Sequence, residues 1–109
     1  MAKKNLGQSN PAADTPTSLY TVPASKEAVV STFSACNLSD TETATIQLAH
    51  RVSGAALANS MYVYKILEVP PGETFAATLG ITLATTDIVH VQSDTANIAF
   101  NLWGDESDA

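Results

Sequence analysis

The architecture follows from residues 19 to 37, LYTVPASKEAVVSTFSACN, in which two β-like runs flank the turn PAS at residues 23 to 25. The second run, residues 28 to 36, is rich in β-branched and aromatic residues, which suit a pleated, half-buried surface. Both of its faces are small and mostly non-polar, so we expect a central strand with neighbours on both sides. We predict a hairpin-like core here, with Phe33 pointing inward from the face that also carries Val29.

Further strand-length runs follow at regular spacing. They cover residues 43–51, 61–69, 74–83, 88–92 and 96–103, and prolines, glycines or small polar residues separate them. Alternation predicts that Tyr62, Tyr64 and Ile66 share one face, and Gly80 indicates a bulge. About seven strands with such turns favour an all-β fold, a single antiparallel β-sandwich of immunoglobulin-like or jelly-roll-like type. The jelly roll requires an eighth strand, and residues 52–60 are the candidate for it. The other interpretation of these residues is a loop or one helical turn.

The two ends differ from the body in composition. Residues 1–17 contain a single large aliphatic side chain after the start, Leu6, so we expect an extended N-terminal arm before a domain at 18–104. Stretched out, about 16 residues at roughly 3.3 Å each reach on the order of 50 Å, far enough to contact a neighbouring subunit. Gly104 is expected to end the last strand, and residues 105–109, DESDA, to form a solvated acidic tail.

Length and charge restrict the class of protein. A chain of 109 residues with 45% hydrophobic residues supports one compact core, and its net charge of −6 disfavours binding to nucleic acid. Cys36 is the only cysteine, which excludes an internal disulfide. We expect no signal peptide and no membrane association, because no apolar run is long enough, and therefore synthesis in a cytoplasm.

No segment has the spacing of a catalytic or ligand-binding motif. His50 and His90 lie on different predicted strands without a third ligand nearby, and there is no G-x-S-x-G elbow or phosphate-binding loop. We therefore expect a protein that is not an enzyme, with no metal and no cofactor.

The candidate functional residues are instead residues for binding a partner. In the arm they are Asn5, Leu6, Gly7 and Gln8, which are suited to lie along a neighbour's sheet edge.

Trp103 is the only tryptophan and is out of phase with the inward-facing Ile98, Phe100 and Leu102, so it is either an outer-face anchor or a lid over one end. Tyr62 and Tyr64, two residues apart, are suited to present a pair of aromatic rings to a glycan.

From Leu6 to Gly104 the sequence resembles small structural proteins of tailed bacteriophages. The most specific motifs are LYTVPA at residues 19–24, GAALAN at 54–59 and LGITLATTD at 79–87, whereas the ending DESDA departs from the pattern. The resemblance implies a virion protein, most simply a capsid decoration or cement protein that stabilises the head shell. Its expected partners are the major capsid protein and neighbouring copies of itself. The alternative is a tail, neck or fibre-associated structural or host-glycan-binding module.

Overall fold

The expected strands form in the structure, a computed structural model that describes residues 2–109. Met1 lies outside the described residues. Two single turns of 3-10 helix, η1 (Val52–Gly54) and η2 (Asn59–Met61), interrupt an otherwise all-β chain. The strands are β1 (Ala2–Ser9), β2 (Thr17–Thr21), β3 (Lys26–Asn37), β4 (Ala44–Arg51), β5 (Tyr62–Val69), β6 (Thr74–Leu83), β7 (Ile88–Ser93) and β8 (Ile98–Asp108).

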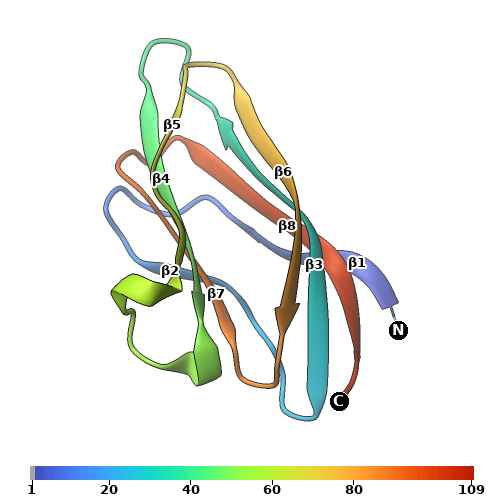
Figure 1. The fold of residues 1–109 in the computed structure, drawn as a ribbon. Coiled ribbons are helices and arrows are strands. Elements are labelled where there is room, and N and C mark those ends of the chain that lie inside the picture. Colours follow the sequence, from blue (N-terminus) through green and yellow to red (C-terminus); the bar gives the residue numbers. More distant parts are fainter. Residues whose placement is uncertain (1) are drawn as a thin grey trace.

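The strands form two four-stranded antiparallel sheets that pack face to face (Figure 1). Their orders are β1-β8-β3-β6 and β2-β7-β4-β5, so every connection except β4–β5 crosses from one sheet to the other. This is the strand order of a jelly roll. The predicted β-sandwich is therefore confirmed. Its eighth strand is β1, whereas residues 52–60 contain the loop and turns that were the other interpretation of that segment.

The stretch 19–37 contains two strands and the predicted turn, but it is not a hairpin. β2 pairs with β7, whereas β3 pairs with β6 and β8 in the opposite sheet. The turn is closed by the Lys26 amide, which donates to the Pro23 carbonyl oxygen at 3.2 Å. Because the two runs lie in opposite sheets, their apolar sides face each other across one shared core.

β3 is central in its sheet, as predicted, but its inward face changes halfway along. Val30 and Phe33 are both fully buried although they are three positions apart, an odd spacing that strict alternation would place on opposite faces. The register with β8 and β6 shifts between Val30 and Thr32, which places Ser31 in a β-bulge. A bulge inserts one residue and so reverses the alternation. The predicted inward face is correct for Phe33 and wrong for Val29, which lies on the outer face.

The core lies between the sheets and is centred on three phenylalanines. The Phe33 ring stacks on Phe100 at 6.0 Å between centroids and lies 6.5 Å from Phe75. Phe33 comes from β3, Phe100 from β8 and Phe75 from β6, so the cluster ties together three strands of one sheet. Ile46, Leu48 and Val91 cover it from the other sheet, in the alternation predicted for residues 43–51.

The predicted arm is wrong for residues 2–9, because these residues are a strand of the sandwich. β1 pairs with β8 from Ala2 opposite Glu106 to Ser9 opposite Phe100. A low apolar content argues against a segment that folds alone. It does not argue against an edge strand, which is held mainly by backbone hydrogen bonds to an existing sheet and buries few side chains. Of the eight residues, Leu6 packs against the core.

The predicted acidic tail is wrong as well. β8 continues through Gly104 to Asp108, and its residues 106 and 108 pair with Ala28 and Lys26 of β3. Gly104 does not end the strand. It lies within the strand because the backbone of β3 passes too close for any side chain at this position. A side chain there would collide with the carbonyl oxygen of Val29. Lys4 and Lys26 offset the acidic ending through ion pairs with Glu106 at 2.9 Å and Asp108 at 2.6 Å.

Candidate partner-binding surfaces

The outer face of the β1-β8-β3-β6 sheet carries a group of uncharged side chains. The register places Asn5, Trp103, Thr32 and Thr78 in one row across four strands, and Gln8, Asn101, Ser34 and Ala76 in the next. We call these eight residues the neutral face. A patch without charge on a domain of net charge −6 has the composition of the centre of a protein interface, from which charged residues are depleted.

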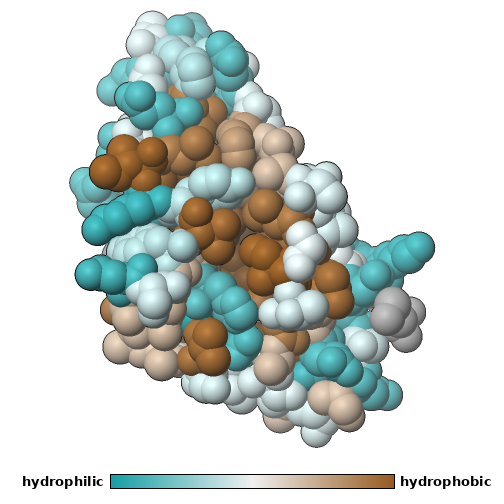
Figure 2. Space-filling view, in the orientation of Figure 1, coloured by the Kyte–Doolittle hydropathy of each residue, from teal (hydrophilic) through white to brown (hydrophobic). Residues whose placement is uncertain are grey.

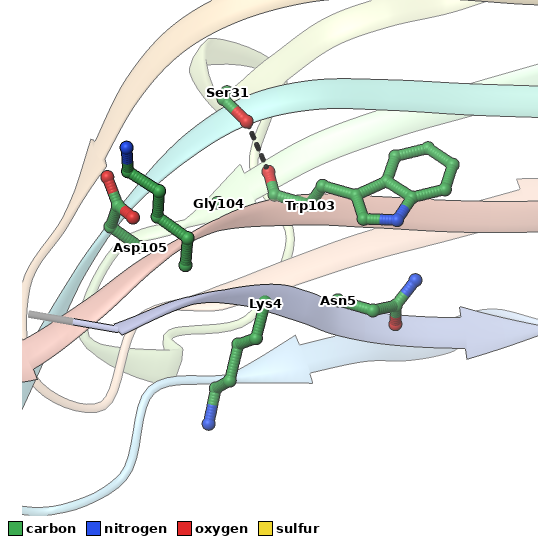
Figure 3. Close-up of a pocket in the computed structure, with 7 residues that line it drawn as sticks. Lys4, Asn5, Ser31, Trp103, Gly104 and Asp105 are labelled. Carbon is green, nitrogen blue, oxygen red and sulfur yellow. Dashed lines mark hydrogen bonds between the residues drawn. The ribbon is translucent and has the colours of Figure 1, made fainter.

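Trp103 projects from the neutral face and is 38% exposed. It borders an open pocket of about 460 Å³ that is also lined by Asn5, Ser31 and Asp105. In Figure 3 the Asn5 and Trp103 side chains lie side by side, on the neighbouring strands β1 and β8. Trp103 therefore lies on the outer face of the sheet and is not a lid over the end of the core.

The local backbone explains why these side chains point outward. Leu102 and Gly104 face inward, so alternation along β8 turns Trp103 and Asp105 to the outer face. The bulge at Ser31 aligns β3 with this part of β8, and the Ser31 hydroxyl donates to the Trp103 carbonyl oxygen at 3.2 Å. The rim of the pocket is thus fixed by strand pairing.

Charged residues also line the pocket, namely Lys3 and Lys4 together with Asp105. The Lys4 side chain leaves β1 on the side away from Trp103 (Figure 3). Its ammonium group forms an ion pair with Glu106. The other oxygen of Glu106 accepts a hydrogen bond from the Tyr20 hydroxyl at 2.5 Å. That hydrogen bond and then Lys4 hold the pKa of Glu106 below its ordinary value, and burial followed by the Glu106 carboxylate raises the pKa of Tyr20. One buried oxygen of Asp105, Oδ1, has no hydrogen-bond partner among the described residues.

The four predicted arm residues are divided between the surface and the core. Asn5 and Gln8 are exposed on the neutral face, where the structure brings them together with Trp103. Leu6 packs on the core, and Gly7 lies so close to β2 that a side chain would collide with the Leu19 carbonyl oxygen. Leu6 and Gly7 are therefore occupied by contacts within their own chain.

Tyr62 and Tyr64 lie elsewhere, on β5, and do not form a pair of exposed rings. Tyr64 is half-buried and meets Phe75 edge to face, with 5.3 Å between ring centroids. The Lys65 ammonium lies 5.1 Å from the centre of the Tyr62 ring. A bulge in β5 puts Ile66 out of phase with these tyrosines, contrary to the predicted shared face, and leaves it 78% exposed.

Apolar side chains collect where β5 and β6 border the open side of the sandwich. We call this region the β5–β6 edge; it comprises Val63, Tyr64, Ile66, Leu67, Phe75, Leu79 and Ile81. Figure 2 shows hydrophobic residues across the middle of this face of the molecule. Contiguous apolar surface on a polar domain marks a binding site or an aggregation hazard. Alternation did not predict this edge, because it places Tyr64 and Ile66 on one face of residues 61–69 and Val63 and Leu67 on the other.

One polar cluster has no counterpart in the sequence-based candidates. The buried Asp87 carboxylate accepts hydrogen bonds from the Ser53 amide at 2.7 Å and the Ala84 amide at 3.0 Å, and its Oδ2 lies 2.7 Å from His50 Nε2. Burial raises the pKa of Asp87, but these hydrogen bonds outweigh it and keep the pKa below its ordinary value. The cluster joins the β4–β5 and β6–β7 connections, which is a structural function.

Within residues 2–109, no three His, Cys, Asp or Glu side chains are grouped so as to hold a metal ion. In the same range, no helix has the length and apolar character needed to cross a membrane. Comparison of the chain with protein-family models, curated proteins and solved structures finds no match.

Proposed function

We propose that the protein is a non-enzymatic structural component of a tailed-bacteriophage virion that decorates and stabilises the head shell. The sequence motifs between Leu6 and Gly104 support the phage setting. The jelly roll is compatible with it, because this architecture occurs in viral capsid domains, although it also occurs in lectins and enzymes. The architecture alone therefore does not identify the function, which depends on the residues at the surface.

The observation that carries the proposal is the neutral face with its protruding Trp103. Tryptophan is one of the residues that are enriched in interface hot spots, where its ring fills a pocket on the partner. The face is the outer surface of a sheet of four paired strands. It is suited to lie against the surface of another folded protein, and we propose that this protein is the major capsid protein.

Binding to particles tests this function. Particles of the encoding phage that lack the protein are incubated with purified wild type or variants, and bound copies are counted after sedimentation. Trp103→Ala should reduce binding by about 10- to 100-fold, as expected for a hot-spot residue. Val52→Ser is the matched control, because Val52 is an exposed apolar residue on the β4–β5 connection and outside the neutral face. Equal binding by both variants would contradict the assignment of the face.

Stabilisation of the head shell is measured separately, as the temperature at which heated particles release their DNA. Particles without the protein should release DNA at a lower temperature, and wild-type protein should restore the higher one. Particles that are equally robust without the protein but fail to adsorb to cells would contradict a cement function and support a tail location.

The pocket beside Trp103 favours one alternative, a host-glycan-binding module of the tail, neck or fibre. It combines an exposed aromatic ring with the polar groups of Asn5, Ser31 and Asp105, whose buried Oδ1 lacks a hydrogen-bond partner. A saccharide offers an apolar ring face together with hydroxyl groups, which matches this combination. A glycan array probed with wild type and Trp103→Ala tests it: retention of a glycan by wild type alone would favour the module.

A further inference from the structure

The free edge of β6 differs from the other three sheet edges. The outer strands are β1 and β6 in one sheet and β2 and β5 in the other. β1 carries two lysines and a bulge, β2 has five residues and a bulge, and β5 carries Lys65, Glu68 and a bulge. Charges, bulges and short length are the usual protections against edge-to-edge pairing. β6, with ten residues and no charge or proline, has fewer of them.

The regular part of this edge is TFAAT, Thr74 to Thr78. β6 pairs with β3 without interruption over these residues, and the register then shifts between Thr78 and Ile81, around the glycine predicted to mark a bulge. Thr74, Ala76 and Thr78 point to the outer face, whereas Phe75 and Ala77 point toward the core and are half-buried. Five regular residues ending at a bulge define one short segment for pairing.

We propose that two copies of the chain pair through this segment, with the β6 strands antiparallel about a twofold axis at Ala76. Thr74 then faces Thr78 of the second copy, and Phe75 faces Ala77 of the second copy. Threonine pairs are favourable across antiparallel strands, and a large ring beside a methyl group packs without overlap. No like charges meet, because the segment has none. The sequence TFAAT is thus complementary to itself, which a twofold contact requires.

The other sheet contributes to the same contact. A twofold axis perpendicular to paired strands passes through both layers of a sandwich, whose sheets lie about 10 Å apart. The β5 strands of the two copies therefore also approach each other. This brings together the apolar residues of the β5–β6 edge, including Ile66, which is 78% exposed, and Val63, which is 39% exposed. Pairing gives these side chains an apolar environment that the single chain does not provide.

The proposed pairing does not depend on the proposed function. Its consequence for binding to the head does rest on that function. Two β1-β8-β3-β6 sheets joined at β6 present two neutral faces on one continuous eight-stranded sheet. A bivalent unit binds a surface far more tightly than a single copy when both faces engage at once. The second contact, which the sequence-based interpretation placed in an N-terminal arm, would then come from the second copy.

Sedimentation of the purified full chain over a wide concentration range tests the pairing. We expect a monomer–dimer equilibrium that tightens as salt rises, because salt screens the repulsion between two chains of net charge −6. Ala76→Lys places two like charges opposite each other and should weaken the dimer by about tenfold or more. Thr82→Lys is the control, since Thr82 is exposed on the same strand and beyond the bulge. Mixing Ala76→Lys with Ala76→Asp should restore dimers.

Disulfide trapping tests the register independently of affinity. Opposite Cα atoms in antiparallel strands are about 4.5 or 5.5 Å apart, within the range that a disulfide bridges. In a Cys36→Ala background, Ala76→Cys should give a covalent dimer on oxidation, and Thr82→Cys should not. A wild type that is monomeric at every concentration, equal weakening by both lysine variants, or equal cross-linking at both positions would overturn the proposal. Because free protein is used, none of these results depends on binding to the head.

Discussion

Replacing Phe33 by alanine tests the core and the strand phase together. Phe33 is completely buried and contacts two other phenylalanine rings, Phe100 and Phe75. Truncating a buried phenylalanine removes its transfer free energy and leaves a cavity, at a cost of about 3–5 kcal/mol. For a small domain with a total stability of about 5–15 kcal/mol, this is a large fraction. We therefore expect Phe33→Ala to fold but to be close to its limit of stability.

The assay is reversible unfolding in urea and by heat. In a chain of this length each kcal/mol shifts the thermal midpoint by about 4 °C, so we expect a decrease of about 12–20 °C with a lower urea midpoint. Thr32→Ala is the matched control, because Thr32 is the neighbouring residue on the outer face and should change the midpoint by only a few degrees. A midpoint for Phe33→Ala within a few degrees of wild type would refute the position of the bulge at Ser31.

Three further predictions concern the two chain ends and one buried imidazole. Gly104→Ala should lower the free energy of unfolding by about 1–3 kcal/mol or more, because the new side chain meets the backbone of β3; an unchanged urea midpoint would contradict the close approach. Deleting residues 2–9 should lower the thermal midpoint markedly, whereas a dispensable arm would leave it unchanged. His90 is buried, and burial and then Arg51 lower its pKa below the ordinary value of about 6.5. The unfolded chain therefore takes up the proton more readily, so stability should fall as the pH is lowered below the ordinary histidine pKa, and His90→Gln should flatten that part of the profile.

Much of the fold could be predicted because strand residues alternate and turn residues interrupt them. The inward positions Ile46, Leu48, Ile98, Phe100 and Leu102 follow directly from that alternation. It fails where a bulge adds a residue, as at Ser31 and near Ile66, because a bulge leaves no compositional signature in a run of apolar residues.

The ends of the chain could not be predicted, because they are stabilised by pairing and not by their own side chains. Residues 2–9 look disordered when considered alone, and only the presence of β8 makes them a strand. Gly104 illustrates a related problem. A glycine that permits close packing of two strands and a glycine that ends a strand are the same residue in the sequence.

The candidate surfaces were partly predictable. Asn5, Gln8 and Trp103 were identified individually, but the neutral face depends on the register of four strands. Its one sequence signal is the lack of charge at outward positions of residues 74–83 and 98–103, which becomes visible once the inward positions are known. The β5–β6 edge depends on strand order alone, since it exists because β5 and β6 are both outermost.

A density map of the intact virion tests the proposed function most directly. We predict the eight-stranded sandwich in many copies on the outside of the head, with the Trp103 face of β1-β8-β3-β6 against the major capsid protein. A sandwich located at the tail tip, or a head without density for it, would contradict the proposal.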